Sequence, residues 1–166
     1  MLVIPDTEEN LDLVNGVLMH GNIPFTGLLE SYYNSGKIKS RTNYSTGRKE
    51  GLEKEWYQND SVFSERFYNK GIKIGVHKAW WHNGNPKFIY HFNSKGEYHG
   101  NIKEWYETGS ILKDFNYVNR NEVGSQKVWY ETGKIKANYE VINGERFGLI
   151  GLKKCYQVSV GSEEVN

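Results

Sequence analysis

The sequence predicts an all-β protein in which one elongated, curled antiparallel meander is built from repeated β-hairpins. The first observation is a pair of adjacent aromatic residues that recurs at steps of 24, 24, 25 and 24 residues along the 166-residue chain. The pairs are Tyr32-Tyr33, Trp56-Tyr57, Trp80-Trp81, Trp105-Tyr106 and Trp129-Tyr130. A glycine lies five residues before each pair, at Gly27, Gly51, Gly75, Gly100 and Gly124. A period of this length is typical of a stacked array of structural units.

The second observation is the alternation of side chains that follows each aromatic pair. In the fifth unit one set of alternate residues is Ile135, Ala137, Tyr139 and Val141, and the other set is Lys134, Lys136, Asn138 and Glu140. A period of two with one polar face is typical of a half-buried antiparallel strand. Each unit is therefore predicted to be two strands, and the array a long meander.

Glycines mark both turns of each predicted hairpin. The turn after the aromatic pair holds Gly36, Gly84, Gly109 and Gly133, with Asp60 in this place in the second unit. Because glycine, and next asparagine or aspartate, adopt a positive φ most readily, we expect a positive φ at Gly84, Gly109 and Asp60. The other turn holds Gly47, Gly71, Gly96 and Gly144. The fifth unit has Asn119-Arg120-Asn121 instead, where either asparagine could be left-handed after a one-residue shift.

The two ends of the chain read as caps. Residues 1–26 are predicted to be an N-terminal capping segment, because Asn15-Gly16 between two apolar runs is a strong hairpin signal. This hairpin is expected to pair with Phe25-Thr26-Gly27, where the first unit begins. Residues 27–148 form the five repeats, and residues 149–166 are predicted to be a C-terminal cap strand followed by a disordered tail.

The predicted sheet has no helical segment to cover its aromatic face. A flat sheet of ten or more strands would expose an apolar patch much larger than soluble monomers tolerate. We therefore expect the sheet to curl, to dimerise, or to hold a partner.

The composition and charge of the chain argue against several classes of function. The net charge is +1 with acids and bases interspersed, so no overall field attracts nucleic acid, and the basic residues from Lys37 to Lys49 read as a solvated face. The single cysteine, Cys155, excludes an internal disulfide framework. The acidic N-terminus lacks a signal-peptide pattern, and no apolar run reaches membrane-spanning length. A cytoplasmic location is expected unless a leader has been removed.

No catalytic or cofactor motif is visible in the sequence. The histidines His20, His77, His82, His91 and His99 are scattered. His82 and His91 flank one hairpin, but two histidines without a placed carboxylate or thiolate make a poor zinc site. Acids such as Glu53 and Glu104 read as sheet-face charges paired with lysines. We therefore expect neither an enzyme nor a bound metal or cofactor.

The spacing of glycines and aromatic pairs resembles the variant MORN repeat, over about residues 16 to 148. Strong copies are Tyr32-Tyr33-Asn34-Ser35-Gly36-Lys37-Ile38-Lys39 and Trp129-Tyr130-Glu131-Thr132-Gly133-Lys134-Ile135-Lys136. Bacterial proteins of this kind are often called YwqK-family antitoxins, so the resemblance implies binding and neutralising a toxin encoded nearby. Longer eukaryotic relatives are linked to membrane scaffolding and to dimeric rods.

These observations predict a non-enzymatic protein-binding repeat module, an antitoxin or immunity protein. The alternative is a structural scaffold that self-associates as a homodimer or contacts membrane lipid. Adjacent residues of a strand point to opposite faces, so one ring of each pair can be core while the other is displayed. Because interface energy concentrates in buried aromatic anchors, the predicted partner-binding residues are Trp56, Trp80, Trp81 and Trp105.

Overall fold

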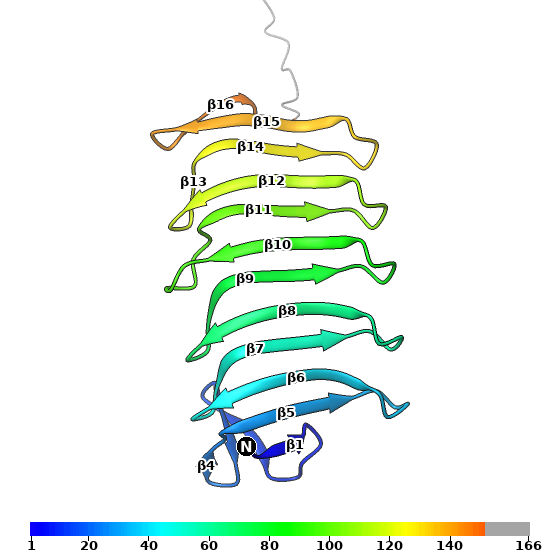
Figure 1. The fold of residues 1–166 in the computed structure, drawn as a ribbon. Helices are drawn as coiled ribbons and strands as arrows, with labels where there is room; N and C mark the ends of the chain where they lie inside the picture. Colours follow the sequence, from blue (N-terminus) through cyan, green and yellow to red (C-terminus); the bar gives the residue numbers. More distant parts are fainter. Residues whose placement is uncertain (152–166) are drawn as a thin grey trace, which may run out of the picture.

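The computed structural model describes residues 1–151 and confirms an all-β fold made of one long sheet and a small second sheet (Figure 1). The strands of the long sheet are β1 (Val3–Pro5), β5 (Gly27–Tyr32), β6 (Ile38–Ser45), β7 (Arg48–Trp56), β8 (Val62–Asn69), β9 (Ile72–Trp80), β10 (Pro86–Phe92), β11 (Gly100–Trp105), β12 (Ile111–Val118), β13 (Asn121–Glu122), β14 (Gly124–Trp129), β15 (Ile135–Ile142) and β16 (Glu145–Leu149). The predicted cap strand and tail lie outside the described residues, apart from their first three positions.

The long sheet is an open meander in a single layer. From β5 to β16 each strand pairs antiparallel with the next hairpin strand, and Figure 1 shows them stacked like rungs with turns on both sides. A register shift of the bulge type recurs at the aromatic pair, for example between Glu55 and Trp56 and between Glu104 and Trp105. Bulges bend the strand and increase its twist. Their repetition at one end of every hairpin gives the expected curl a physical cause.

The turn chemistry follows the sequence rules closely. Gly84, Gly109 and Asp60 have φ values of 86°, 89° and 68°, as predicted. Except at Gly96, where only the glycine is left-handed, the opposite turns have two successive residues with positive φ, which is the two-residue turn whose twist matches flanking antiparallel strands. These turns are Thr46-Gly47, Lys70-Gly71, Asn119-Arg120 and Asn143-Gly144, and the turn of the N-terminal hairpin, Asn15-Gly16, is of the same kind. In the fifth unit Asn119 is left-handed, with a φ of 48°, as predicted for one of the two asparagines, but the predicted one-residue shift is wrong, because Arg120 takes the glycine place with a φ of 73°.

The N-terminal cap follows the expected arrangement in part, since the hairpin reaches Phe25 through Leu18 but does not continue the long sheet. The hairpin of β2 (Leu11–Val14) and β3 (Val17–His20) forms as predicted, but β3 pairs with β4 (Ile23–Pro24) in a separate three-stranded sheet. The edge of the long sheet is instead β1, which pairs parallel with β5. Phe25 is 2 % exposed and joins the two sheets, since its N–H donates to Leu18 O and its carbonyl accepts from Gly47 N–H.

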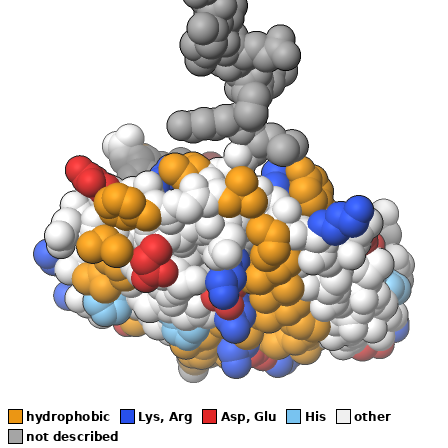
Figure 2. Space-filling model, turned by 90° about the horizontal axis from the view of Figure 1, so that it is seen from above, with side chains coloured by type: hydrophobic (Ala, Val, Ile, Leu, Met, Phe, Trp, Pro, Cys, Tyr) orange, Lys and Arg blue, Asp and Glu red, His pale blue; other side chains and the backbone are white. Residues whose placement is uncertain are grey.

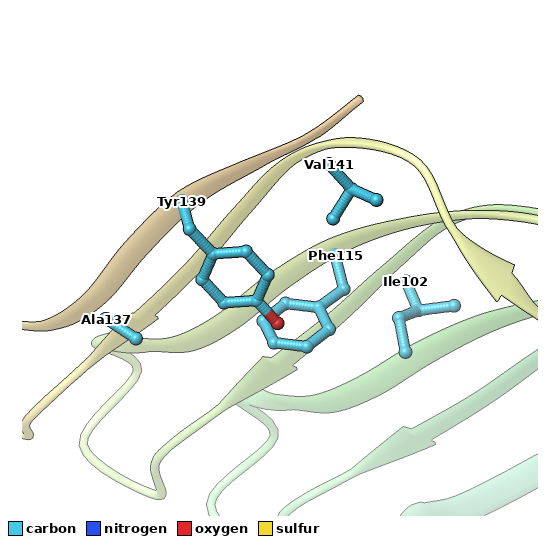
Figure 3. Packing of buried hydrophobic residues seen from close by; sticks show 5 residues of the cluster. All are labelled: Ile102, Phe115, Ala137, Tyr139 and Val141. Carbon is cyan, nitrogen blue, oxygen red and sulfur yellow. The ribbon is translucent and has the colours of Figure 1, made fainter. Parts of the chain in front are cut away.

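Burial is concentrated on one face of the long sheet, which we call the core face. Near its C-terminal end Ile102, Phe115, Ala137, Tyr139 and Val141 form a cluster contributed by β11, β12 and β15 (Figure 3). Gln126 on β14 is fully buried, and its Nε2 donates to the carbonyls of Asn116 and Val123. The buried amide thus provides hydrogen bonds to main-chain carbonyls at the place where the short strand β13 interrupts the pairing of β12 with β14.

His77 lies in the middle of the core face and is 2 % exposed. Its ring lies between Tyr68 and Phe92, at centroid distances of 5.6 and 4.7 Å, and Nε2 is 2.9 Å from Phe67 O. Burial lowers the pKa of His77 below its usual value of 6.5, and the nearby cations Lys73 and Arg66 act in the same direction.

We expect this histidine to make the fold sensitive to mild acid. Below about pH 6.5 the unfolded chain takes up a proton that the folded chain resists, so the free energy of unfolding falls as the pH drops towards the folded-state pKa. Urea melts of His77→Gln should show a smaller loss between about pH 7.5 and about pH 5.5 than wild type. His82→Gln, at an exposed position, is the control and should keep the wild-type loss. Equal pH dependence in all three proteins would contradict this role of His77.

The repeat register predicts that one internal unit can be removed. Deleting residues 71–95 joins Lys70 to Gly96, which restores the turn, and keeps the four-residue spacing to the next glycine, Gly100. Because each unit contacts mainly its neighbours, the shortened chain should unfold cooperatively, with a β-type circular dichroism spectrum. Removing residues 1–26 should instead uncover Leu29 and Tyr44, which pack on the N-terminal core, and cause aggregation. If the variant without residues 71–95 is unfolded while the variant without residues 1–26 stays soluble, the repeat-array interpretation is wrong.

Candidate functional site

In the first four aromatic pairs the second residue connects one unit to the next. Its side chain donates to the main-chain carbonyl of the first aromatic residue in the following unit. The four bonds are Tyr33 Oη to Trp56 O (2.8 Å), Tyr57 Oη to Trp80 O (2.9 Å), Trp81 Nε1 to Trp105 O (3.0 Å) and Tyr106 Oη to Trp129 O (3.0 Å). We call these hydrogen bonds the inter-unit bonds. They assign the second ring of these four pairs to the framework of the array.

The faces of these second rings are also occupied. The side chain six residues later in the same unit packs on the ring in at least four units. Lys39 Nζ lies 6.0 Å from the Tyr33 ring centroid, Lys87 Nζ lies 4.3 Å from that of Trp81, and Lys136 Nζ lies 5.6 Å from that of Tyr130. In the second unit Phe63 makes an edge-to-face contact with Tyr57 at 5.1 Å. A ring with a bonded edge and a covered face is poorly placed to receive a partner.

The first residue of each pair lies on the face opposite the core face. Trp56 ends β7, and both Arg41 and Lys54 from the central part of that opposite face approach its ring, at 6.0 and 5.7 Å. By strand alternation and register, the equivalent residues Tyr32, Trp80, Trp105 and Trp129 share this face. We call it the tryptophan face. Each tryptophan on it is half-buried.

A charged row runs beside the tryptophans across the whole sheet. Its members are successive cross-strand partners: Glu30, Arg41, Lys54, Glu65, Lys78, Ile89, Lys103, Asp114, Lys127 and Asn138. Three ion pairs lie within the row, Arg41–Glu30 at 2.6 Å, Lys54–Glu65 at 2.8 Å and Lys103–Asp114 at 3.3 Å. Within residues 1–151, Lys78 and Lys127 have no carboxylate within ion-pair distance. The row therefore presents an excess of positive charge.

A shallow hollow of about 200 Å³ opens beside the first junction. It is lined by Tyr33, Lys39, Glu55, Trp56, Tyr57 and Phe63. Trp56 and Tyr57 of one aromatic pair both line this hollow, together with Glu55, which is on the core face by register with Ser64. A small apolar group of a partner could enter here.

The strongest polar cluster belongs to the core face and is fully paired. Glu53 is 6 % exposed, forms a salt bridge with Lys49, lies 3.4 Å from Arg66 Nη1 and accepts from Tyr68 Oη at 3.1 Å. Burial raises the pKa of Glu53, but Lys49, Arg66 and Tyr68 outweigh it, so the carboxyl pKa is lower than usual. Thr42 adds a further hydrogen bond at 3.3 Å. This buried carboxylate is held in its ionised form by donors of the sheet itself, as buried polar groups in folded proteins usually are.

Metal ligands do not gather in the part of the chain that the structure describes. No group of three or more His, Cys, Asp or Glu side chains is placed there to hold an ion. His82 contacts the Tyr57 ring at 5.1 Å, and His91 Nδ1 bonds to Asn101 O, so the two histidines have separate partners. Over residues 1–151 no helix is long and apolar enough to cross a membrane.

The structure separates the four tryptophans predicted from sequence. Trp56, Trp80 and Trp105 share the tryptophan face, whereas Trp81 donates an inter-unit bond. Sequence reasoning missed Trp129 as the fourth member of this row. It also missed the lysine two residues before each of these tryptophans: Lys54, Lys78, Lys103 and Lys127. The Lys-x-Trp spacing was a visible signal, because residues two apart on a strand share a face.

Comparison with known proteins identifies the repeat. A family model described as the MORN repeat variant matches residues 25–45, 49–70, 98–119 and 122–143, which together are more than half of the chain. These four segments coincide with the first, second, fourth and fifth units. The third unit, with Trp80 and Trp81, lies between the matched segments. No curated protein matches the chain.

We expect the inter-unit bonds to contribute measurably to stability. Tyr106→Phe removes the donor to Trp129 O but keeps the ring, so it should lower the free energy of unfolding by about 0.5–1.5 kcal/mol. Tyr117→Phe is the matched control, since its ring is half-buried like that of Tyr106 and its hydroxyl makes no hydrogen bond within residues 1–151. Urea melts that show equal losses for both variants would argue against a special role of these bonds.

Proposed function

The chain belongs to the MORN repeat variant family, and from that premise we propose that it is a non-enzymatic module that binds another protein. The observation that carries the proposal is the row of four half-buried tryptophans on one face, each with a lysine two residues earlier on the same strand. Tryptophan is the side chain most enriched among residues that dominate binding energy. The inter-unit bonds need only the side chain of the second residue, so the ring of the first residue is not held by a hydrogen bond of the framework, although Arg41 and Lys54 lie against the ring of Trp56.

The more specific proposal is that the partner is a toxin and that the chain neutralises it in the cytoplasm as an antitoxin or immunity protein. A long, preformed sheet face suits this task, because a rigid surface loses little conformational freedom on binding. The satisfied core-face charges and the lack of a metal-ligand cluster within residues 1–151 agree with a binding role. The decisive genetic test is whether a neighbouring gene arrests growth when expressed alone and loses this effect when the chain is coexpressed.

A self-associating scaffold is the second candidate, and one observation favours it. The last described strand, β16, is an exposed edge of the long sheet. Phe147 and Leu149 on β16 are 52 % and 48 % exposed, and nearby Ile142 is 54 % exposed. Figure 2 looks onto this end of the stack, where hydrophobic side chains reach the surface beside charged ones. An apolar edge that is unpaired within residues 1–151 can pair with a second copy, which concentration-dependent sedimentation would detect.

Partner capture should depend on the tryptophan face. The double variant Trp80→Ala with Trp105→Ala should bind the partner more weakly by about 2–4 kcal/mol while remaining folded. The partner is recovered by pull-down from the native host, and its affinity is then measured with purified proteins. Tyr106→Phe, next to Trp105, is the control and should lose stability but keep the affinity. A folded double variant with wild-type affinity would place the interface elsewhere.

A further inference from the structure

We propose that the tryptophan face binds a segment in the polyproline II conformation that carries an acidic residue at every third position. The inference rests on the proposed protein-binding function and adds to it the face, the direction and the chemistry of the partner. The segment would run along the stack of strands, at right angles to them, over the row of tryptophans.

The first argument is the spacing of the Lys-x-Trp units. They occupy β7, β9, β11 and β14, which are alternate strands of the sheet. Because neighbouring strands lie about 4.8 Å apart, successive Lys–Trp units lie about 9.6 Å apart. A partner that uses the same contact in every unit must therefore repeat at close to this distance.

Among regular backbone conformations, polyproline II matches this distance best. It has three residues per turn with a rise of about 3.1 Å, so one edge presents a residue about every 9.3 Å. From Trp56 to Trp129 the mismatch sums to about 1 Å over the three steps. An α-helix returns a residue to the same face about every 10.5 Å and is out of register by almost 3 Å over that span. An extended strand repeats about every 6.7 Å and contacts successive units differently.

The second argument is the apolar lining of the row. The cross-strand partner of each tryptophan is aliphatic: Val62 for Trp56, Pro86 for Trp80, Ile111 for Trp105 and Ile135 for Trp129. Indole rings thus alternate with aliphatic side chains along the row. Proline-rich segments bind on grooves lined by aromatic side chains, and their preformed conformation loses little entropy on binding. Prolines at every third position would contact every tryptophan.

The third argument is the charge beside the tryptophans. A lysine lies two residues before each tryptophan on the same strand. Of these lysines, Lys78 and Lys127 have no ion-pair partner within residues 1–151. Lys54 and Lys103 are each paired with a carboxylate of the neighbouring strand. An acidic side chain that follows the prolines would meet the unpaired lysines at alternate units. Those two lysines should therefore contribute most to the preference for an acidic segment.

Synthetic peptides test the spacing directly. The probe is a peptide of five Pro-Ala-Glu triplets, and the control has the same composition with the prolines and glutamates shuffled out of the three-residue spacing. Titration of the full chain at low salt, followed by tryptophan fluorescence and calorimetry, should show binding of the triplet peptide. The affinity of the shuffled peptide should be lower by about tenfold or more. Equal affinities for the two peptides would overturn the proposed conformation.

Charge exchange tests the role of the lysines. Lys78→Glu with Lys127→Glu should weaken the Pro-Ala-Glu peptide by about tenfold or more and should gain affinity for Pro-Ala-Lys triplets. Lys95→Glu with Lys134→Glu, at two exposed lysines in turns, carries the same change of net charge and is the matched control. It should bind both peptides like the wild type. Identical behaviour of the two double variants would overturn the proposed charge contact.

Other ligands and the natural partner complete the test. If a single-stranded oligonucleotide or anionic vesicles bind through Lys78 and Lys127 and the triplet peptide does not, the inference is wrong. If Trp80→Ala with Trp105→Ala loses the natural partner but neither peptide binds the wild type, the protein-binding function stands and the polyproline II inference fails. If the peptides bind through this face and the natural partner does not need it, the assignment of the partner interface to the tryptophan face fails instead.

Discussion

The array depends on one hydrogen bond repeated at each of four junctions, from the second aromatic side chain of a unit to a main-chain carbonyl in the next unit. A single-layered sheet has no second layer to fix its units relative to one another, so contacts between units must do this. The donor can be the Tyr57 hydroxyl or the Trp81 indole N–H. Phenylalanine has no donor, and although the chain has 7 phenylalanines, none occupies this position.

Because of this bond, the two residues of an aromatic pair have different roles. The second ring is fixed by its hydrogen bond and covered by a lysine or an apolar side chain, as Lys87 covers Trp81. The first ring supplies only its main-chain carbonyl to the junction, so its side chain is not specified by the framework. Four units nevertheless place tryptophan there, the most costly ring to leave half-exposed to water. This is the physical reason for assigning the binding surface to the first rings.

The sequence predicted the elements whose chemistry is local. The hairpins follow from alternation, and the turns follow from backbone requirements at Gly84, Gly109 and Asp60. Contacts between segments far apart in the sequence were harder to predict. The parallel pairing of Val3–Pro5 with β5 involves three residues, too few for a pattern to emerge. The separation of Trp80 from Trp81 by role depends on a bond 24 residues away, which periodicity indicates only as an equivalence of positions. The lysine row was visible in the sequence but needed the strand register to become a continuous surface.

The third unit shows what the framework requires and what it leaves free. It lies between the segments that the family model matches, it has one extra residue in its second turn, and it has tryptophan in both aromatic positions. Yet its hairpin keeps the bulge, the positive φ at Gly84 and the bond from Trp81 to Trp105 O. Sequence departures are therefore tolerated wherever the donor, the turn and the register persist. Because Trp80 and Lys78 are outside those three requirements, the unit nearest the middle of the sheet can carry the side chains that a partner needs without loss of the array.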